Sequence, residues 1–484
     1  MLKKINKKAI DFINRPAKVL QFGAGNFLRA FADLLIDVAN EKLDIDMGIV
    51  ACKATSGVNK DGLTIIDDLQ KQDNMYHVCL EGVENKEIKK EIRLVKSIID
   101  SVNPYVEYEK YRKYILTPEL RFIISNTTEA GIRYVEGDDI KSTPPNSFPA
   151  KMTALLYERF RHFNGDITKG LIILCCELIE DNSCTLKKYI LQHAEYHNLE
   201  KEFVRWIEVA CIFCDTLVDR IVPGFPYDTI EEIKANTGFD DELVVKGELY
   251  HLWVIGGRDY KQVQKEFPLD KAGFNVLFME SIKEFRDKKV RILNGSHTGM
   301  VPVALQLGCE TVKQAFDTIL VERFINKMVR EEVIPVIDED KHELDKFASS
   351  ILERFYNPAI KHKLSDISLN SLSKWEARNY PTLKDYSKKF GKIATCECFT
   401  FAALMTLYSG KSEFEPRDAR SNIEYIQTNW DSSNMQATIT KIVKESGIFT
   451  VDLSEIPMFI ETAASYVESI EILGMQAALK KIIL

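Results

Sequence analysis

The stretch VLQFGAGNFLRAF, residues 19–31, decides the fold. An apolar run ends at Gly23, Gly25 follows, and the next residues have apolar side chains at helical spacing. Glycines between a first strand and a first helix let the backbone approach a pyrophosphate, which the helix amino terminus attracts. Leu28 stands at the third glycine position of this pattern, and Arg29 is placed to meet a phosphate. The stretch therefore predicts a dinucleotide-binding turn, and the alternative is a glycine turn without a ligand.

Apolar runs and amphipathic stretches alternate outward from this turn. The strand-like runs include DMGIVACKA, YHVCLEGV, RFIISN and GLIILCCEL, and the helix-like stretches include DGLTIIDDLQ, VEYEKYRKYIL and AKMTALLYERFRHF. Such alternation predicts an α/β fold, a doubly wound parallel sheet of Rossmann type covered on both faces. Helical periodicity dominates from about residue 184, where EFVRWIEVACIFCDTLVDRI is predicted as one helix, although VVKGELYHLWVIGG adds strands. We expect a dinucleotide-binding domain over 1–275 and an all-helical substrate and catalytic domain over 276–484.

Composition narrows the class of protein. Among 484 residues, 45% are hydrophobic and 28% charged, and the formal net charge is −8. This mildly acidic balance predicts no general attraction for nucleic acid or anionic membranes. No apolar run reaches the roughly 18 residues of a membrane helix, and no secretory signal is recognised, so we expect a cytoplasmic protein. Composition leaves open a local basic pocket for a small acidic substrate, and it leaves the oligomeric state open.

The ten cysteines are too sparse for a disulfide scaffold. Cys211 and Cys214 form a C-x-x-C, but it lies in an apolar run and has no companion pair with suitable spacing. We therefore expect buried, reduced thiols rather than a redox or metal site.

The second strand of a dinucleotide-binding fold normally ends in an acid that holds the adenosine ribose. In IVACKATSG, residues 49–57, that place is taken by Lys53. A cation suits the 2′-phosphate of NADP, so charge alone leaves NADP open beside NAD.

The stretch KKVRILNGSHTGMVPVALQLG, residues 288–308, carries the candidate reacting centre. Lys289, Asn294 and His297 stand at spacings of five and three, and the last two share a face if the segment is helical. A partly buried lysine can exchange a proton near neutral pH, and an asparagine amide can donate to a developing oxyanion. A histidine can orient a hydroxyl. The alternative is a solvated lysine, a capping asparagine and a core histidine.

The chain resembles the long-chain mannitol dehydrogenase family of polyol and sugar-acid reductases over most of its length. FGAGNFLRAF is similar to the family's nucleotide loop, including the replaced third glycine. Further similar stretches are SNTTEAGI (125–132), FPAKMTALLYERF (148–160), CELIEDN (176–182), TLVDRIVPGFP (216–226) and LNGSHTGMVPVA (293–304).

The resemblance implies a role for each candidate residue. Lys289 would be the acid in reduction and the base in oxidation, Asn294 would stabilise the oxyanion, and His297 would position the substrate. Asn182 matches a second family asparagine, although Ser183 replaces the glycine that usually follows it. The implied cofactor-binding residues are Gly23, Gly25, Asn26, Phe27, Arg29, Asn126 and Thr127.

The resemblance also implies a substrate site, a cofactor and a reaction. NPAIKHKLSDISLNSLSKWEARNYPTL, residues 357–383, is similar to the family's substrate-closing segment, and its Lys374 and Arg378 are candidates for a substrate carboxylate. Their alternative is a solvated helix face. The family works without metal and is mostly NAD-linked, so NAD is expected. The implied reaction is the reversible reduction of the keto group of tagaturonate to altronate with NADH. Alternatives are a fructuronate reductase, a mannitol-type polyol dehydrogenase, or a nucleotide-sensing protein without catalysis, which would not require all three residues of the reacting centre.

Overall fold

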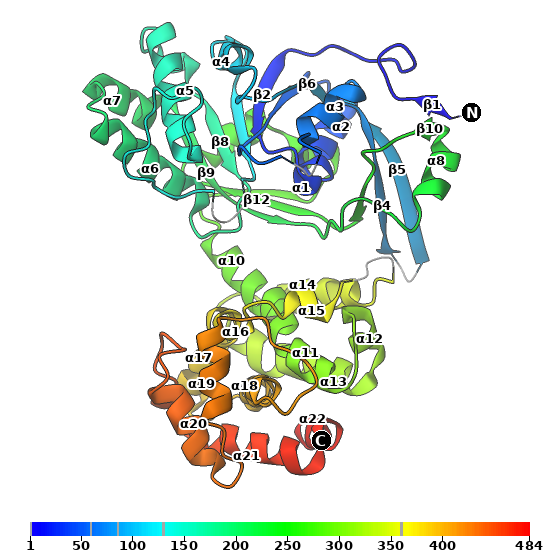
Figure 1. Cartoon of the computed structure of the whole chain (residues 1–484), viewed down its shortest axis with the longest axis vertical. Helices are drawn as coiled ribbons and strands as arrows, with labels where there is room; N and C mark the ends of the chain where they lie inside the picture. The colour runs from blue at the N-terminus through cyan, green and yellow to red at the C-terminus, as the bar shows by residue number, and fades with distance from the viewer. Residues whose placement is uncertain (1, 59–60, 85–86, 128–130, 359–361) are drawn as a thin grey trace. The chain divides into compact units, whose positions relative to one another are not determined.

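A computed structural model describes residues 2–58, 61–84, 87–127, 131–358 and 362–484. The chain divides into two compact units, Met1–Ile282 and Lys283–Leu484. Figure 1 shows the strands in the first of these and helices in the second.

The main sheet of the first unit confirms the predicted doubly wound fold. Its strand order is β13-β12-β9-β8-β7-β2-β3-β6, and the strands from β9 to β6 are all parallel. At one edge β12 runs antiparallel to β9, so the sheet is mixed at that edge, a detail that the predicted parallel sheet did not include. The strands are β2 (Ala17–Phe22), β3 (Gly48–Cys52), β6 (Ile98–Val102), β7 (Phe122–Ser125), β8 (Ile172–Cys175), β9 (Ile212–Asp219), β12 (Leu252–Gly256) and β13 (Val276–Met279).

Helices cover both faces of this sheet (Figure 1). Neighbouring residues of a strand pack into the hydrophobic cores on opposite faces of the sheet. In β2, for example, Val19 belongs to one core and Leu20 to the other. This explains why the strands read as continuous apolar runs. The helices are α1 (Asn26–Arg29), α2 (Ala32–Leu43), α3 (Ile65–Lys71), α4 (Tyr108–Ile115), α5 (Phe148–His162), α6 (Asn182–Tyr196), α7 (Lys201–Ala210), α8 (Ile230–Thr237) and α9 (Tyr260–Glu266).

A smaller sheet in the first unit was only partly anticipated. The strand predicted at YHVCLEGV is β4 (Tyr76–Glu84), and it pairs with β5 (Glu87–Val95) and β11 (Val245–Glu248) rather than with the main sheet. A further two-stranded pairing joins β1 (Lys3–Lys4) to β10 (Phe239–Asp240).

The prediction of one helix across EFVRWIEVACIFCDTLVDRI is wrong. Helix α7 ends at Ala210, and β9 begins at Ile212 between β8 and β12. A short apolar run fits a buried strand as well as a helix, so periodicity alone could not separate the two. Cys211 and Cys214 are buried, and all ten cysteines are free thiols.

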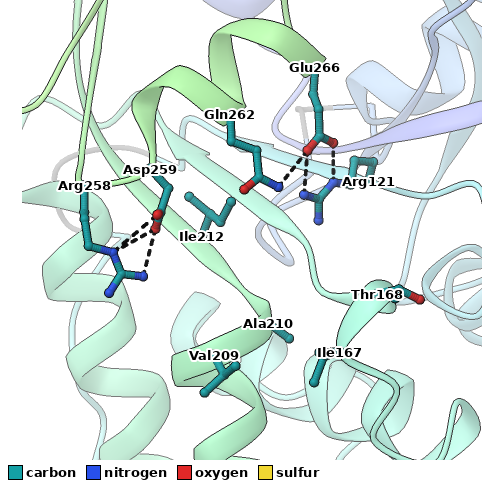
Figure 2. Close-up of a pocket in the computed structure, with 10 residues that line it drawn as sticks. All are labelled: Arg121, Ile167, Thr168, Val209, Ala210, Ile212, Arg258, Asp259, Gln262 and Glu266. Carbon is teal, nitrogen blue, oxygen red and sulfur yellow. Dashed lines mark hydrogen bonds and ion pairs between the residues drawn. The ribbon is translucent and has the colours of Figure 1, made fainter.

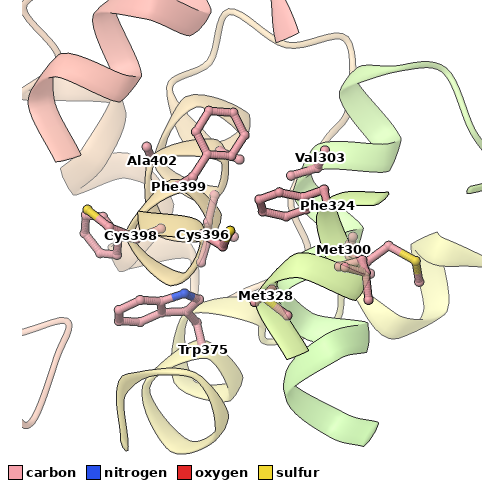
Figure 3. Close-up of a cluster of buried hydrophobic side chains, with 14 of the residues drawn as sticks. Met300, Val303, Phe324, Met328, Trp375, Cys396, Cys398, Phe399 and Ala402 are labelled. Carbon is pink, nitrogen blue, oxygen red and sulfur yellow. The ribbon is translucent and has the colours of Figure 1, made fainter. Parts of the chain in front are cut away.

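The second unit is helical throughout its regular structure. Helix α18 lies at its centre, because Cys396–Tyr408 are all buried and the helix packs against α11 and α21. Figure 3 shows Trp375, Phe324 and Met328 around this helix. A helix that is apolar on all sides belongs in a core. The helices are α10 (Lys283–Lys289), α11 (Gly295–Gln306), α12 (Val312–Asp317), α13 (Ile319–Lys327), α14 (Lys341–Phe355), α15 (Leu364–Ile367), α16 (Ser371–Arg378), α17 (Tyr380–Phe390), α18 (Thr395–Tyr408), α19 (Arg420–Thr428), α20 (Met435–Lys444), α21 (Phe459–Leu473) and α22 (Met475–Ile483).

Within the described ranges, no helix has both the length and the apolar character needed to cross a membrane.

Candidate active site

The glycine turn joins β2 to α1 as the sequence predicts. Gly23 has a φ of +109°, and a Cβ there would lie 2.8 Å from the carbonyl oxygen of Asn126. Gly25 is different, because its φ is −70° and a Cβ would meet no atom within 4 Å. Protein packing therefore demands a glycine at Gly23, whereas open space lies beside Gly25. Such a cradle fits the close approach of a dinucleotide phosphate.

Arg29 lies inside the protein rather than on the open side of this turn. Its guanidinium donates to the carbonyl of Leu243 at 2.7 Å and to Oδ1 of Asn26 at 2.7 Å. Burial is the main cause that lowers the pKa of Arg29. In this structure the arginine holds Asn26, whose amide nitrogen would lie 2.5 Å from a Cβ on Gly224.

The loop after β7 lies against the glycine turn. The backbone N–H of Asn126 donates to Phe22 at 3.0 Å, and its side-chain amide donates to the carbonyl of Cys176 at 3.2 Å. Thr127 donates to the buried Glu177 through both its N–H and its hydroxyl. The rest of the predicted stretch, residues 128–130, lies outside the described residues.

Asn182 has its side chain engaged by the backbone. Its Nδ2 lies 2.9–3.0 Å from the carbonyl oxygens of Cys175, Glu177 and Thr216. Its Oδ1 accepts from the N–H groups of Ser183 and Thr216. Because this side-chain amide bonds five backbone groups, it connects the end of β8 to β9 and stabilises the fold there. We call this set of bonds the Asn182 brace.

Lys53 lies at the end of β3 beside Tyr105. Its ammonium is 5.6 Å from the centre of that ring, and the ammonium of Lys151 is 5.4 Å from the same ring. Burial lowers the pKa of Lys53, and it lowers the pKa of Lys151 to about 8. The acid that usually stands at this strand end is thus replaced by two cations that share one aromatic ring.

A π-helical turn, Val290–Asn294, joins α10 to α11 in the second unit. The N–H of Gly295 donates to the carbonyl of Val290, five residues earlier. Because a π-turn bonds residues five apart, it brings Lys289 and Asn294 towards one face, and the α-helical spacing of three then adds His297. Lys289 is 7% exposed and His297 8% exposed.

His297 is a buried imidazole with cationic side chains around it. Its Nε2 is buried and has no hydrogen-bond partner among the described residues. Burial is the main cause that holds the pKa of His297 well below its usual value. Positive charge adds to this effect from His362, Arg354, Arg378 and Lys289. A cluster of this kind suits an anionic ligand.

The structure separates the two predicted carboxylate ligands. Arg378, at the end of α16, donates to the hydroxyl of Thr298 at 3.2 Å and its charge acts on His297. Lys374, one turn earlier, donates to the carbonyl of Ile367 at 3.0 Å. Sequence reasoning missed Arg354 and His362, and the only available signal was their place in or beside the stretch that resembles the substrate-closing segment.

A cavity of about 400 Å³ in the first unit contains none of the predicted residues. Figure 2 shows Arg121 and Glu266 forming a two-pronged ion pair at one side of it. Arg121 precedes β7 and Ile212 begins β9, so the cavity lies at the amino ends of strands whose carboxyl ends face the glycine turn. Within the first unit, it therefore lies at the opposite edge of the sheet from the glycine turn. No group of three or more potential metal-ligating side chains occurs within the residues described.

Two family models cover the chain. The mannitol dehydrogenase Rossmann domain matches residues 17–270, and the mannitol dehydrogenase C-terminal domain matches residues 281–471. The chain belongs to the mannitol dehydrogenase family, so the resemblance expected from its sequence is confirmed.

Full-length relatives narrow this class. The chain is 40% identical over 483 residues to an altronate oxidoreductase of Bacillus subtilis, covering 99% of this chain and 98% of the relative. It is 39% identical over 487 residues to an altronate oxidoreductase of Bacteroides thetaiotaomicron, covering all of both chains. An altronate oxidoreductase of Shigella flexneri is 36% identical over 488 residues, at 99% coverage of both.

Solved structures show the same fold. A substrate-free D-sorbitol dehydrogenase superposes with a TM-score of 0.81 at 19% identity, covering 99% of this chain and 100% of the other. A Pseudomonas fluorescens mannitol 2-dehydrogenase in complex with NAD and D-mannitol gives a TM-score of 0.72 at 21% identity, covering 97% and 95%.

Proposed function

We propose that this protein is an NAD-dependent altronate oxidoreductase that interconverts altronate and tagaturonate. The observation that carries the proposal is full-length identity of 36–40% to altronate oxidoreductases from three organisms. The cationic surroundings of His297 support it independently, because altronate and tagaturonate carry a carboxylate that mannitol and fructose lack.

The first unit fits the cofactor. Gly23 and Gly25 would take the pyrophosphate, and Asn126 with Thr127 would lie along the nicotinamide side. When bound, NADH supplies the hydride that reduces the keto carbon. We favour NAD over NADP because the family match outweighs Lys53 alone.

The second unit supplies the proton. In reduction the ammonium of Lys289 gives a proton to the oxygen of the former keto group, and in oxidation the neutral amine takes it back. Asn294 donates an amide hydrogen to the developing oxyanion. His297 has a free Nε2 that can bond a substrate hydroxyl, and its neutral ring leaves the proton exchange to Lys289.

The substrate carboxylate would be bound by the cations near His297. Arg378 is the strongest candidate, because its guanidinium is charged at any working pH and already reaches Thr298 beside His297. Arg354 of α14 would add positive charge, whereas burial lowers the pKa of His362, so that residue would offer a neutral imidazole. The ten free thiols support a reducing, cytoplasmic location.

The test follows NADH and NADPH absorbance with tagaturonate, fructuronate and fructose as separate substrates. We expect NADH oxidation with tagaturonate to exceed that with either other substrate by about a hundredfold in kcat/KM. Faster turnover of fructuronate or fructose would assign the protein to one of those alternatives instead.

Lys289→Ala tests the proton donor, and Lys288→Ala is its matched control. The ammonium of Lys288 bonds Glu339 at 2.7 Å and lies 4.4 Å from the Phe285 ring, so its role is structural. Lys289→Ala should lose turnover by about a thousandfold and keep NADH binding. Parent activity in Lys289→Ala would remove Lys289 from the mechanism, and NADH binding without turnover in the parent would favour a nucleotide sensor.

A further inference from the structure

The carboxyl group of Glu177 is buried directly beyond the end of β8, where the residue is 2% exposed. It accepts hydrogen bonds from the hydroxyl of Ser125 at 3.0 Å, the N–H of Thr127 at 2.8 Å and the hydroxyl of Thr127 at 2.9 Å. All of these donors belong to the end of the neighbouring strand β7 and the loop that follows it. The side chain therefore ties that loop to the carboxyl edge of the sheet.

The opposite side of the same loop touches the glycine turn. The backbone carbonyl oxygen of Asn126 lies only 2.8 Å from the position that a Cβ on Gly23 would take. Asn126 also donates to Phe22, the residue that precedes the turn. The loop is thus held between the Gly23 backbone on one side and the carboxyl of Glu177 on the other, so movement of Glu177 would move the wall of the turn.

Glu177 also joins the brace made by Asn182. Its backbone carbonyl accepts from Nδ2 of Asn182 at 3.0 Å, while the same amide bonds Cys175 and Thr216. One residue therefore connects the loops after β7 and β8. Burial is the main cause that raises the pKa of the Glu177 carboxyl, and the bonds from Thr127 and Ser125 oppose this shift. Since these donors are neutral, hydrogen bonds rather than an ion pair hold the carboxyl group. The position of its oxygens therefore matters more for holding the loop than its charge does.

We propose that Glu177 is a positioning residue for the cofactor, which acts by fixing Asn126 and Thr127 against the glycine turn. The inference rests on the proposed function. A glutamine in its place can still accept from Thr127 through Oε1 and can donate to the hydroxyl of Ser125. An alanine leaves three donors without their partner and frees the loop.

The test measures the Kd of NADH by fluorescence for the parent, Glu177→Ala and Glu177→Gln. We expect Glu177→Ala to weaken binding by about tenfold or more and Glu177→Gln to stay within about threefold of the parent. Hydrogen exchange without cofactor is the second readout, and the Thr127 amide should exchange faster in Glu177→Ala but not in Glu177→Gln.

Asp138→Ala is the matched control. Asp138 is another buried carboxyl of this unit, 4% exposed, and accepts from the N–H groups of Asn146 and Ser147. It should lose stability and keep NADH affinity. If Glu177→Ala does not fold, Thr127→Val removes one of the three bonds and should weaken binding by about threefold.

Three outcomes overturn the inference alone while the parent binds NADH. The first is unchanged NADH affinity in Glu177→Ala or, where that variant does not fold, in Thr127→Val. The second is a loss of affinity in Glu177→Gln as large as in Glu177→Ala. The third is an equal loss of affinity in Asp138→Ala. A parent protein that binds neither NADH nor NAD overturns the proposed function as well.

Discussion

The imidazole rings of His297 and His362 lie 5.3 Å apart between centroids and cross at 82°. His297 also lies 4.4 Å from the ring of Phe355, between centroids, at a tilt of 30°. The histidine thus packs against an aromatic ring and a second imidazole, with Arg378 and Arg354 acting on it electrostatically. This arrangement holds a neutral imidazole in a place where an anion is attracted.

Arg378→Met should therefore raise KM for the sugar acid by about tenfold or more, because the loss of a charge-assisted bond costs more than 1 kcal/mol. Lys374→Met, one helical turn away, should change KM by less than about twofold, because that ammonium is bonded to Ile367. Steady-state kinetics of both variants measure this. A larger effect at Lys374 would reverse the assignment of the carboxylate ligand.

Alanine should reduce stability when it replaces Gly23 and should reduce NADH affinity when it replaces Gly25. Gly23→Ala should lower the free energy of unfolding by about 1–3 kcal/mol, because φ is +109° and the new Cβ meets Asn126. Gly25→Ala should leave stability unchanged, since its φ of −70° and open surroundings accept a Cβ. NADH affinity should nonetheless fall by about tenfold in Gly25→Ala. Urea unfolding and NADH titration separate the two effects, and unchanged affinity in Gly25→Ala would place the phosphate elsewhere.

Asp33 should give the protein a pH-dependent stability cost. Burial raises its pKa from 3.8 to about 7, and the hydroxyl of Tyr76 donates to it at 3.0 Å. Between these two pKa values the unfolded chain ionises Asp33 while the folded protein keeps it protonated, so the cost grows with pH and is complete above about 7. Asp33→Asn should raise the free energy of unfolding at pH 8 by up to about 4 kcal/mol and leave it unchanged below pH 4. Urea unfolding at both pH values checks this, and an equal gain at both would contradict it.

Asn182→Asp tests the brace between β8 and β9. An aspartate cannot donate to the three carbonyls that surround Nδ2, and a carboxylate is repelled by them. We expect a loss of about 3 kcal/mol or more at pH 8, larger than for Asn182→Ala, and a smaller loss at pH 5, where protonation restores a donor. If both variants keep parent stability but lose turnover, the amide acts on substrate rather than on the fold.

The sequence predicted the fold well wherever local pattern and tertiary position agree. The glycine turn and the strands β2, β7 and β8 are short apolar runs bounded by turn residues, so their type and order were readable. The segment after Cys211 was not, because β9 has no exposed residue and its apolar run matches either periodicity. The strand β4 pairs with the adjacent β5 and with β11, which lies about 170 residues away, and the local pattern does not contain this distant partner.

The candidate site was predictable only where its residues lie in one stretch. Lys289, Asn294 and His297 were found together, but the π-turn that aligns them has no sequence signature in this reading. Arg354 and His362 come from elements about 60 residues further on, and only packing brings them to His297. The buried bonds of Arg29 and Asn182 were likewise invisible, because a polar residue in a motif does not reveal whether it faces a ligand or the backbone.

The wide turn at Val290–Asn294 holds one more residue than an ordinary helical turn would. A single-codon deletion inside it would restore a regular helix and swing Lys289 by about 100° around the axis relative to His297. Such a protein would have its proposed proton donor turned away from His297. The five-residue spacing of Lys289 and Asn294 therefore serves the reacting centre only because this turn is wider than an α-helical one.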